Sequence, residues 1–255
     1  MDTHIIIPLP KGLSKNQNPY CKEMNKVVNV DMFNDVFMYE NIDDTEDIVQ
    51  QDREPKYGLK KGLLLRLADA AGIIFGESFL IKNEANNVIF QAKAFVRGYD
   101  GSYTEFSATT GLNITLELEK FQKHFTQLAL QYQNSPVAEE RNIFEGKSIG
   151  TWVNEKVKTQ KLILKSNKIA IAETKAKLRL IRTILDLKSG YTQKELQQGF
   201  SVSYIEFKPD LKDEDTRKMY MMMGFNNPLY QQINKRKQPV QEELPLDENI
   251  IDKED

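Results

Sequence analysis

Residues 88–110 have the sequence VIFQAKAFVRGYDGSYTEFSATT, which contains a strand, a tight turn and a returning strand. Apolar and polar residues alternate along its first half, which is the period of a half-buried strand. One face carries Phe90, Ala92, Ala94 and Val96, and the other carries Gln91, Lys93 and Arg97. Asp100-Gly101 is a strong hairpin signal, and the β-prone run Ile73–Ile81 precedes the pair. The sequence therefore predicts a three-stranded antiparallel meander.

Helices are expected on both sides of this meander, which gives an α+β fold. Before it, apolar residues recur at helical spacing from Leu59 to Ala71, and Gly72 stands where a C-terminal cap belongs. After it, residues 116–132 predict a second amphipathic helix, and residues 168–187 predict a third, basic helix. Ser166-Asn167 leaves two alternatives for the preceding residues: one continuous helix, or a separate element with Asn167 as an N-cap.

Composition divides the chain into three parts. Residues 1–56 are expected to form an irregular N-terminal arm, because prolines are frequent in it and residues 31–54 are strongly acidic. Residues 57–208 are expected to form the folded core. Residues 209–255 are polar and end in an acidic tail, 239–255, which is predicted to be disordered.

The bulk composition is typical of a soluble globular protein, with 255 residues, 40% hydrophobic and 28% charged residues and a formal net charge of −2. No apolar run approaches the roughly 18 residues that span a bilayer, and the chain does not begin like a secretory signal. A cytoplasmic protein is therefore expected. Cys21 is the only cysteine, and His4 and His124 are far apart. We expect no internal disulfide, no metal site and no cofactor.

Basic residues form a stripe in and before the third helix. They are three, four or seven residues apart, so a helix would place them on one face: Lys158, Lys161, Lys165, Lys168, Lys175, Arg179 and Arg182. Between residues 155 and 188, ten Lys or Arg residues stand against three acidic residues, a local charge of about +7. Such an excess in a nearly neutral protein is typical of a surface that binds a polyanion, most often nucleic acid. A solvated outer helix face has the same pattern.

Three segments resemble single-strand annealing proteins of phages and mobile elements, in the Rad-fifty-two-like superfamily. They are the strand-turn-strand AFVRGYDGSYTE at 94–105, the helix AETKAKLRLIR at 172–182, and the opening helix that begins YGLKKGL at residue 57. The resemblance covers roughly residues 57–205. It implies a homo-oligomer, as a ring or open helical filament, whose groove holds single-stranded DNA. It also implies annealing to a complementary strand without nucleotide hydrolysis.

The candidate DNA-binding residues lie on the basic helix and on the second strand. The leading phosphate contacts are Lys175, Lys177, Arg179 and Arg182, followed by Lys168, Lys165 and Lys161. Lys93 and Arg97 point outward on the strand and are expected to form the opposite wall of the groove. Tyr103, like Tyr99, has two interpretations, which are base stacking and a cross-strand aromatic pair.

Two other functions stay open. Glu206-Phe-Lys208 has the Glu-x-Lys form found in Mg²⁺-dependent nucleases, but no second acidic residue is expected beside it. The basic helix could instead bind an acidic protein partner, or residues 31–54, in a non-catalytic oligomeric adaptor.

The leading hypothesis is a non-enzymatic protein that binds and anneals single-stranded DNA in ATP-independent recombination or replication of a phage or mobile element. The sequence contains no phosphate-binding Gly-x-x-x-x-Gly-Lys-Ser/Thr loop. A nuclease or a single-strand binding protein is a further expected partner, and no membrane is expected.

Overall fold

The computed structural model describes residues 4–38, 55–137, 142–210, 212–215, 217–218 and 221. The backbone divides into two units, residues 1–208 and 209–255. All helices and strands named below belong to the first unit, which is a mixed α+β structure. The predicted acidic tail, 239–255, and most of the acidic segment, 39–54, lie outside the described residues.

An antiparallel sheet forms where the meander was predicted. Its central strand is β7 (Asn87–Arg97), which pairs with β8 (Tyr103–Asn113) along its whole length. The other edge of β7 pairs with β5 (Ile74–Phe75) and β6 (Phe79–Asn83), so the first predicted strand is split in two. Residues 76–78 separate these strands, and the Gly76 amide still donates to the Lys93 carbonyl at 2.9 Å.

The helices lie close to the positions predicted for them. Helix α1 (Lys61–Ala70) is terminated by Gly72, which follows the C-cap Ala71 and has a φ of +67° that suits glycine. The Ile73 amide donates to the Ala68 carbonyl and closes the last turn. Helix α2 spans Ile114–Asn134 and is followed by the short η1 (Asn142–Phe144). A further short helix, α5 (Gln193–Gln197), begins with a capping box between Thr192 and Glu195.

Helix α4 (Ile149–Ile184) is continuous through Ser166 and Asn167, so the alternative with a break there is wrong. Both side chains donate to the carbonyl of Ile163, at 3.1 Å from Ser166 Oγ and 3.2 Å from Asn167 Nδ2. These bonds run back along the helix, so the Asn167 side chain does not cap a new one. Ser148 caps the true start by accepting from the Thr151 amide.

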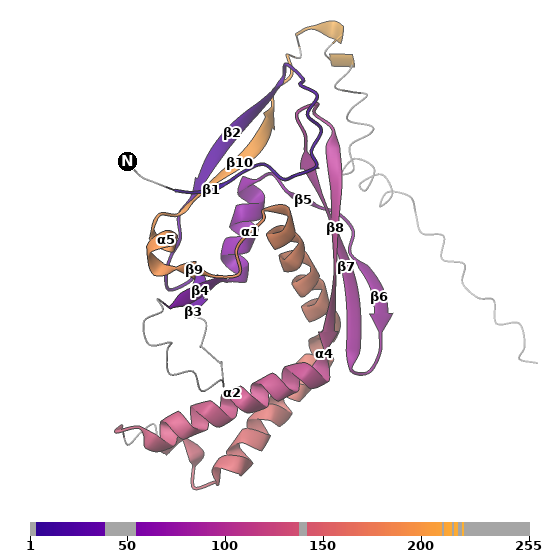
Figure 1. The fold of residues 1–255 in the computed structure, drawn as a ribbon. Coiled ribbons are helices and arrows are strands. Elements are labelled where there is room, and N and C mark those ends of the chain that lie inside the picture. The colour runs from indigo at the N-terminus through magenta and orange to yellow at the C-terminus, as the bar shows by residue number, and fades with distance from the viewer. Residues whose placement is uncertain are drawn as a thin grey trace, which may run out of the picture. The chain divides into compact units, whose positions relative to one another are not determined.

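The main core lies between the β5–β8 sheet and the helices α1 and α4, which Figure 1 shows on one side of that sheet. Alternate residues of β7 are buried, and small residues on α4 allow the helix to approach them. The buried α4 positions here are Ala172, Ala176, Leu180, Ile181 and Ile184. The β7–β8 sheet therefore fixes the position of the C-terminal half of the basic helix.

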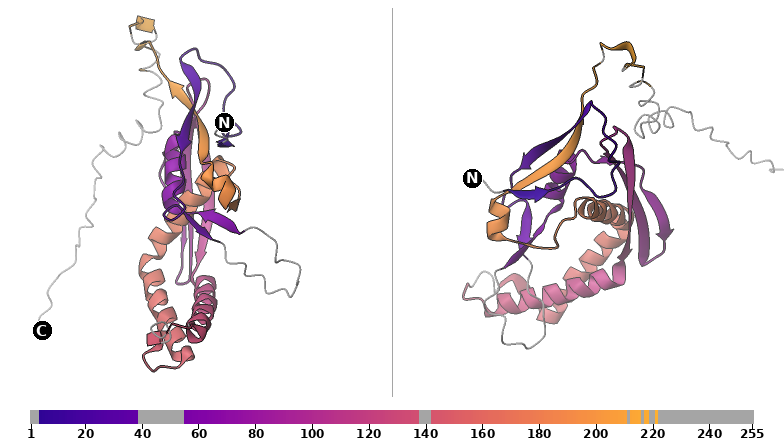
Figure 2. Two further views of the ribbon diagram at one scale, coloured as in Figure 1. Left: turned by 90° about the vertical axis from the view of Figure 1, so that its left-hand side faces the viewer. Right: turned by 45° about the horizontal axis from the view of Figure 1, so that its top comes forward.

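Helix α2 and the first half of α4 form a hairpin beyond the end of the strands (Figure 2). A separate small core holds its tip together around the buried Trp152. The Trp152 ring meets Phe125 and Phe144 edge to face, at centroid distances of 6.1 and 5.6 Å. Trp152 is thus a packing residue of this small core.

Residues 5–38, expected to be largely irregular, contribute strands to two further sheets. Strand β10 (Phe200–Phe207) lies between β1 (Ile5–Ile7), its parallel neighbour, and the antiparallel β2 (Cys21–Val28). The third sheet has the order β3-β4-β9, with bounds Val36–Met38, Lys56–Leu59 and Tyr191–Thr192. The N-terminal arm is therefore part of the folded core, because strands from the far end of that core pair with it.

Candidate nucleic-acid interface

One flank of α4 carries three of the predicted basic residues, which contact α2, β8 and β4 in turn. Lys175 Nζ lies 2.9 Å from Glu117 Oε1 of α2, and Arg179 Nη1 lies 3.4 Å from Thr110 Oγ1 of β8. Arg182 Nη2 donates to the carbonyl of Leu59 at 3.0 Å. The two arginines thus contact neutral oxygens, and none of the described carboxylates pairs with either of them. Their positive charge is therefore not neutralised within the described part of the chain, and the Arg179 side chain is exposed.

The Lys175–Glu117 pair is partly buried, with side-chain exposures of 39% and 22%. Desolvation raises the pKa of Glu117, but the hydrogen bond and charge of Lys175, together with those of Lys120, outweigh it. The pKa of Glu117 therefore lies below its ordinary value, and the carboxylate is charged at neutral pH. A phosphate at Lys175 would have to compete with this carboxylate.

Lys177 lies on the opposite flank of α4 and forms an ion pair with Glu173, one helical turn earlier, at 2.7 Å. The hydrogen bond from Lys177 is the main cause that lowers the pKa of Glu173, and Ser78 of the β5–β6 connection contributes another. This flank faces the β5–β6 edge of the sheet. The structure thus separates Lys177 from Arg179 and Arg182.

Further toward its N-terminus, α4 carries the other three predicted lysines. Lys161 and Lys165 are exposed, and within the described ranges no carboxylate pairs with either side chain. Lys168 Nζ donates to the carbonyl of Glu84, in the β6–β7 turn, at 2.8 Å. These residues extend the positive surface along α4, away from the two arginines.

Lys93 and Arg97 do not form the opposite wall of a groove with α4. The residues between them on β7, Ala94 and Val96, are buried toward α4, so Lys93 and Arg97 point to the other face of the sheet. Lys93 is paired with Glu105 at 2.7 Å. The predicted alternation along β7 is confirmed, but α4 packs against the buried face of the strand, opposite the face that carries Lys93 and Arg97.

Tyr103 lies under Arg97, with the guanidinium carbon 4.6 Å from the ring centroid, and the Arg97 side chain also donates to the Tyr103 hydroxyl. Tyr99 donates to Glu23, and this hydrogen bond raises the pKa of its phenol. The Asn18 amide donates to the Tyr99 carbonyl at 2.8 Å. The hairpin tip is therefore attached to the N-terminal arm, and both tyrosines are occupied by contacts within the chain.

Two lysines at the start of α1, Lys60 and Lys61, follow directly on the residue that Arg182 contacts. They were not predicted as site residues. The Leu59 carbonyl that binds Arg182 directly precedes Lys60, the N-cap of α1, and the exposed Lys61 follows. The first turn of α1 carries no acidic residue. The segment YGLKKGL contains the signal, because two adjacent lysines at a helix start combine side-chain charge with the helix dipole. Arg179, Arg182, Lys60 and Lys61 are called the arginine flank below.

The Glu-x-Lys segment has a local explanation. Glu206 is the last but one residue of the central strand β10, and it forms an ion pair with Lys208 at 2.9 Å. No group of three or more potential metal ligands gathers anywhere in the described part of the chain. Among those residues there is also no helix long and apolar enough to cross a membrane.

Comparison with known proteins identifies no relative: no family model, no curated protein and no solved structure matches this chain. The resemblance to annealing proteins therefore stays a prediction. The interpretation of the basic surface depends on the contacts described above.

Proposed function

We propose that this protein binds single-stranded DNA and anneals complementary strands without hydrolysing ATP, in recombination or replication of a phage or mobile element. The observation that carries the proposal is the arginine flank, where Arg179 and Arg182 bind only neutral oxygens beside Lys60 and Lys61. Guanidinium groups bind phosphate in a bidentate manner and cannot lose their charge at neutral pH.

The predicted contact residues fall into two groups, those that already pair with a carboxylate of the chain and those that do not. Lys93, Lys175 and Lys177 have carboxylate partners, so each would have to exchange one anion for another. Among the predicted contact residues on α4, those for which none of the described carboxylates is a partner are Lys161, Lys165, Lys168, Arg179 and Arg182. Five phosphate contacts by these residues would give a log–log salt slope of about −3.5 for single strands.

Assembly into a ring or filament is part of the proposal. Among the described strands, β6 and β8 each pair only with β7, which leaves the two edges of this sheet open. The β6 edge exposes Phe79, Leu80 and Ile81. Two different open edges favour head-to-tail association, which closes into a ring or continues as a filament.

Charge reversal on the arginine flank tests the proposal. The variant Arg179→Glu/Arg182→Glu should bind an oligo-dT at least about 25-fold more weakly at about 0.1 M salt, since each lost phosphate contact removes about fivefold. It should also lose annealing of complementary oligonucleotides. The control Lys15→Glu/Lys22→Glu makes the same charge change at exposed positions on the N-terminal arm and β2. Equal affinities of the flank variant and the wild type would refute the proposal.

A second function, an adaptor for an acidic protein, is favoured by one observation. Leu162 and Ile163 of α4 are 64% and 45% exposed and lie between Lys161 and Lys165. Exposed apolar side chains beside lysines suit an acidic amphipathic partner. Such an adaptor would bind an acidic helical peptide in a salt-dependent way and would not bind oligonucleotides.

A further inference from the structure

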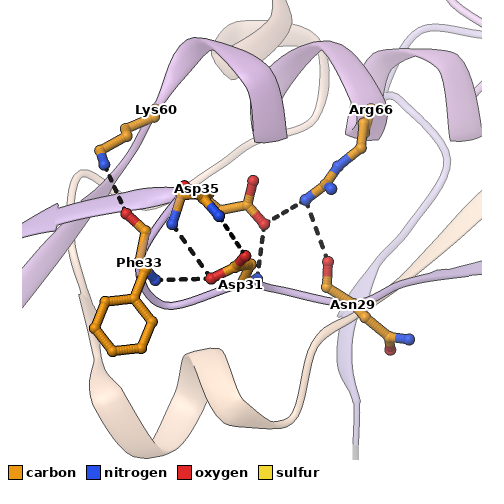
Figure 3. Close-up of polar contacts among 7 residues, drawn as sticks. Asn29, Asp31, Phe33, Asp35, Lys60 and Arg66 are labelled. Carbon is orange, nitrogen blue, oxygen red and sulfur yellow. Dashed lines mark hydrogen bonds and ion pairs between the residues drawn. The ribbon is translucent and has the colours of Figure 1, made fainter.

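A tight turn at residues 31–35 presents one aromatic side chain to solvent. Phe33 is 90% exposed, far more than a phenylalanine with a packing role. In Figure 3 its ring points away from the polar groups that hold the turn. An isolated exposed apolar residue is common on protein surfaces, so the structure around it decides whether this one has a role.

The turn is held rigidly from within. The Asp31 carboxylate accepts from the amides of Phe33 and Asn34, at 2.9 and 3.3 Å, and from Asn34 Nδ2 at 2.7 Å. These hydrogen bonds, from Asn34 first, lower the pKa of Asp31, so the carboxylate stays charged to unusually low pH. The backbone of Phe33 is therefore held in place, so only the side-chain torsions of the ring remain to be ordered when it binds a ligand.

The turn is also fastened to α1 (Figure 3). Asp35 is 5% exposed, accepts from the Asp31 amide at 2.7 Å and pairs with Arg66, which in turn donates to the Asn29 carbonyl. The Asp35 carbonyl accepts from the Lys60 amide at 2.8 Å. An ion pair between a buried carboxylate and a half-exposed guanidinium, together with a backbone bond, thus holds the turn against α1.

These contacts place Phe33 next to the arginine flank. Lys60 Nζ donates to the Phe33 carbonyl at 3.0 Å, and the residue before Lys60, Leu59, accepts from Arg182. Lys61 is exposed one position further along. The backbone of Phe33 thus lies beside Lys60 while its ring points outward (Figure 3), and both turn carboxylates are engaged in hydrogen bonds within the turn.

We propose that Phe33 is a stacking platform for one base of a single strand whose neighbouring phosphates contact Lys60 and Lys61. The inference rests on the proposed function and names the part of the surface that contacts bases. Single strands are bound by a positive surface that follows the backbone together with aromatic rings that stack on bases. A nucleobase suits the site because it combines a flat apolar face with a phosphate on either side, matching the ring and the lysines.

The test compares two probes of equal charge, an oligo-dT and an abasic oligonucleotide of the same length. Phe33→Ala should bind the oligo-dT about 5- to 150-fold more weakly and the abasic strand with unchanged affinity. Phe33→Trp should retain the oligo-dT affinity, and the oligo-dT should quench its added fluorescence. Since Phe33 is almost fully exposed, neither variant should change the thermal midpoint. The control Met24→Ala removes an exposed apolar side chain from β2 and should leave the difference between the probes unchanged.

Three outcomes would overturn the inference. One is an unchanged oligo-dT affinity of Phe33→Ala while Arg179→Glu/Arg182→Glu still loses binding; the proposed function then stands without this platform. Another is an equal loss for both probes, which would mean that the ring does not contact bases. The third is a changed oligomeric state with base-dependent binding intact, which would assign Phe33 to a contact between copies of the chain. If the wild type binds neither probe, the proposed function itself fails.

Discussion

Substituting Glu117→Gln should strengthen the binding of single-stranded DNA. The Glu117 carboxylate lies 2.9 Å from Lys175 Nζ, on the same flank of α4 as Arg179 and Arg182. The amide of glutamine can still accept a hydrogen bond from Lys175 but carries no charge. Lys175 then becomes available to a phosphate without displacing an anion from the same chain.

The size of the effect follows from counterion release. One added phosphate contact makes the log–log salt slope more negative by about 0.7, which is about fivefold in affinity at about 0.1 M salt. The Lys175 and Glu117 side chains are 39% and 22% exposed, so the lost pair should lower the free energy of unfolding by less than about 1 kcal/mol. The variant should therefore bind more tightly while being slightly less stable.

Fluorescence anisotropy with a labelled oligo-dT over a series of salt concentrations measures the affinity and the salt slope. The matched control is Glu173→Gln, which makes the same charge change but frees Lys177 on the flank that contacts Ser78. Its salt slope should stay that of the wild type. Equal gains in both variants would mean that only net charge matters, and no gain in Glu117→Gln would exclude Lys175 from the interface.

Three further predictions concern stability. Asp35→Ala should lower the free energy of unfolding by about 2 kcal/mol, because the Asp31 amide and the half-exposed Arg66 lose their acceptor. Urea titration measures this loss, and Asp69→Ala, at an exposed carboxylate, is the control. Gly72→Ala should cost about 1 kcal/mol because its φ is +67°, whereas Gly62→Ala, within α1 and facing open space, should raise the thermal midpoint. The lowered pKa of Glu195, caused first by its hydrogen bond from Lys188, contributes stability above the ordinary glutamate pKa of 4.5 that is lost as pH falls further. If the urea midpoint fell with decreasing pH as steeply in Glu195→Gln as in the wild type, this last prediction would be wrong.

Local patterns predicted the elements that form from local contacts. The alternation in residues 88–97 and the Asp-Gly turn were sufficient for the β7–β8 hairpin, whose strands are close in sequence. Strands β1 and β2 were missed because they pair with β10, for example Ile5 with Phe200. The segment CKEMNKVV of β2 is mostly exposed and has no clear alternation, so nothing in it indicated a strand.

The basic stripe was predicted from helical spacing, but spacing does not reveal which charges are neutralised. Glu117 and Glu173 pair with Lys175 and Lys177, and the first of these pairs joins residues 58 positions apart in the sequence. The apolar side of the helix was also only partly predicted. Leu162 is exposed because this part of α4 extends beyond the sheet and packs beside α2, whereas Leu180 is covered by the main core.

The partners of the basic residues divide α4 into positions that hold their own anion and positions that do not. A lysine beside a carboxylate has little attraction left for a phosphate, because the two negative groups compete for one cation. An arginine that donates to a carbonyl or hydroxyl is oriented just as well, yet it keeps its charge. A phosphate then replaces a neutral acceptor by a charged one, which is the stronger hydrogen bond. For this reason Arg179 and Arg182, rather than the neighbouring Lys175 and Lys177, are the residues in the C-terminal half of α4 best prepared to bind the proposed strand.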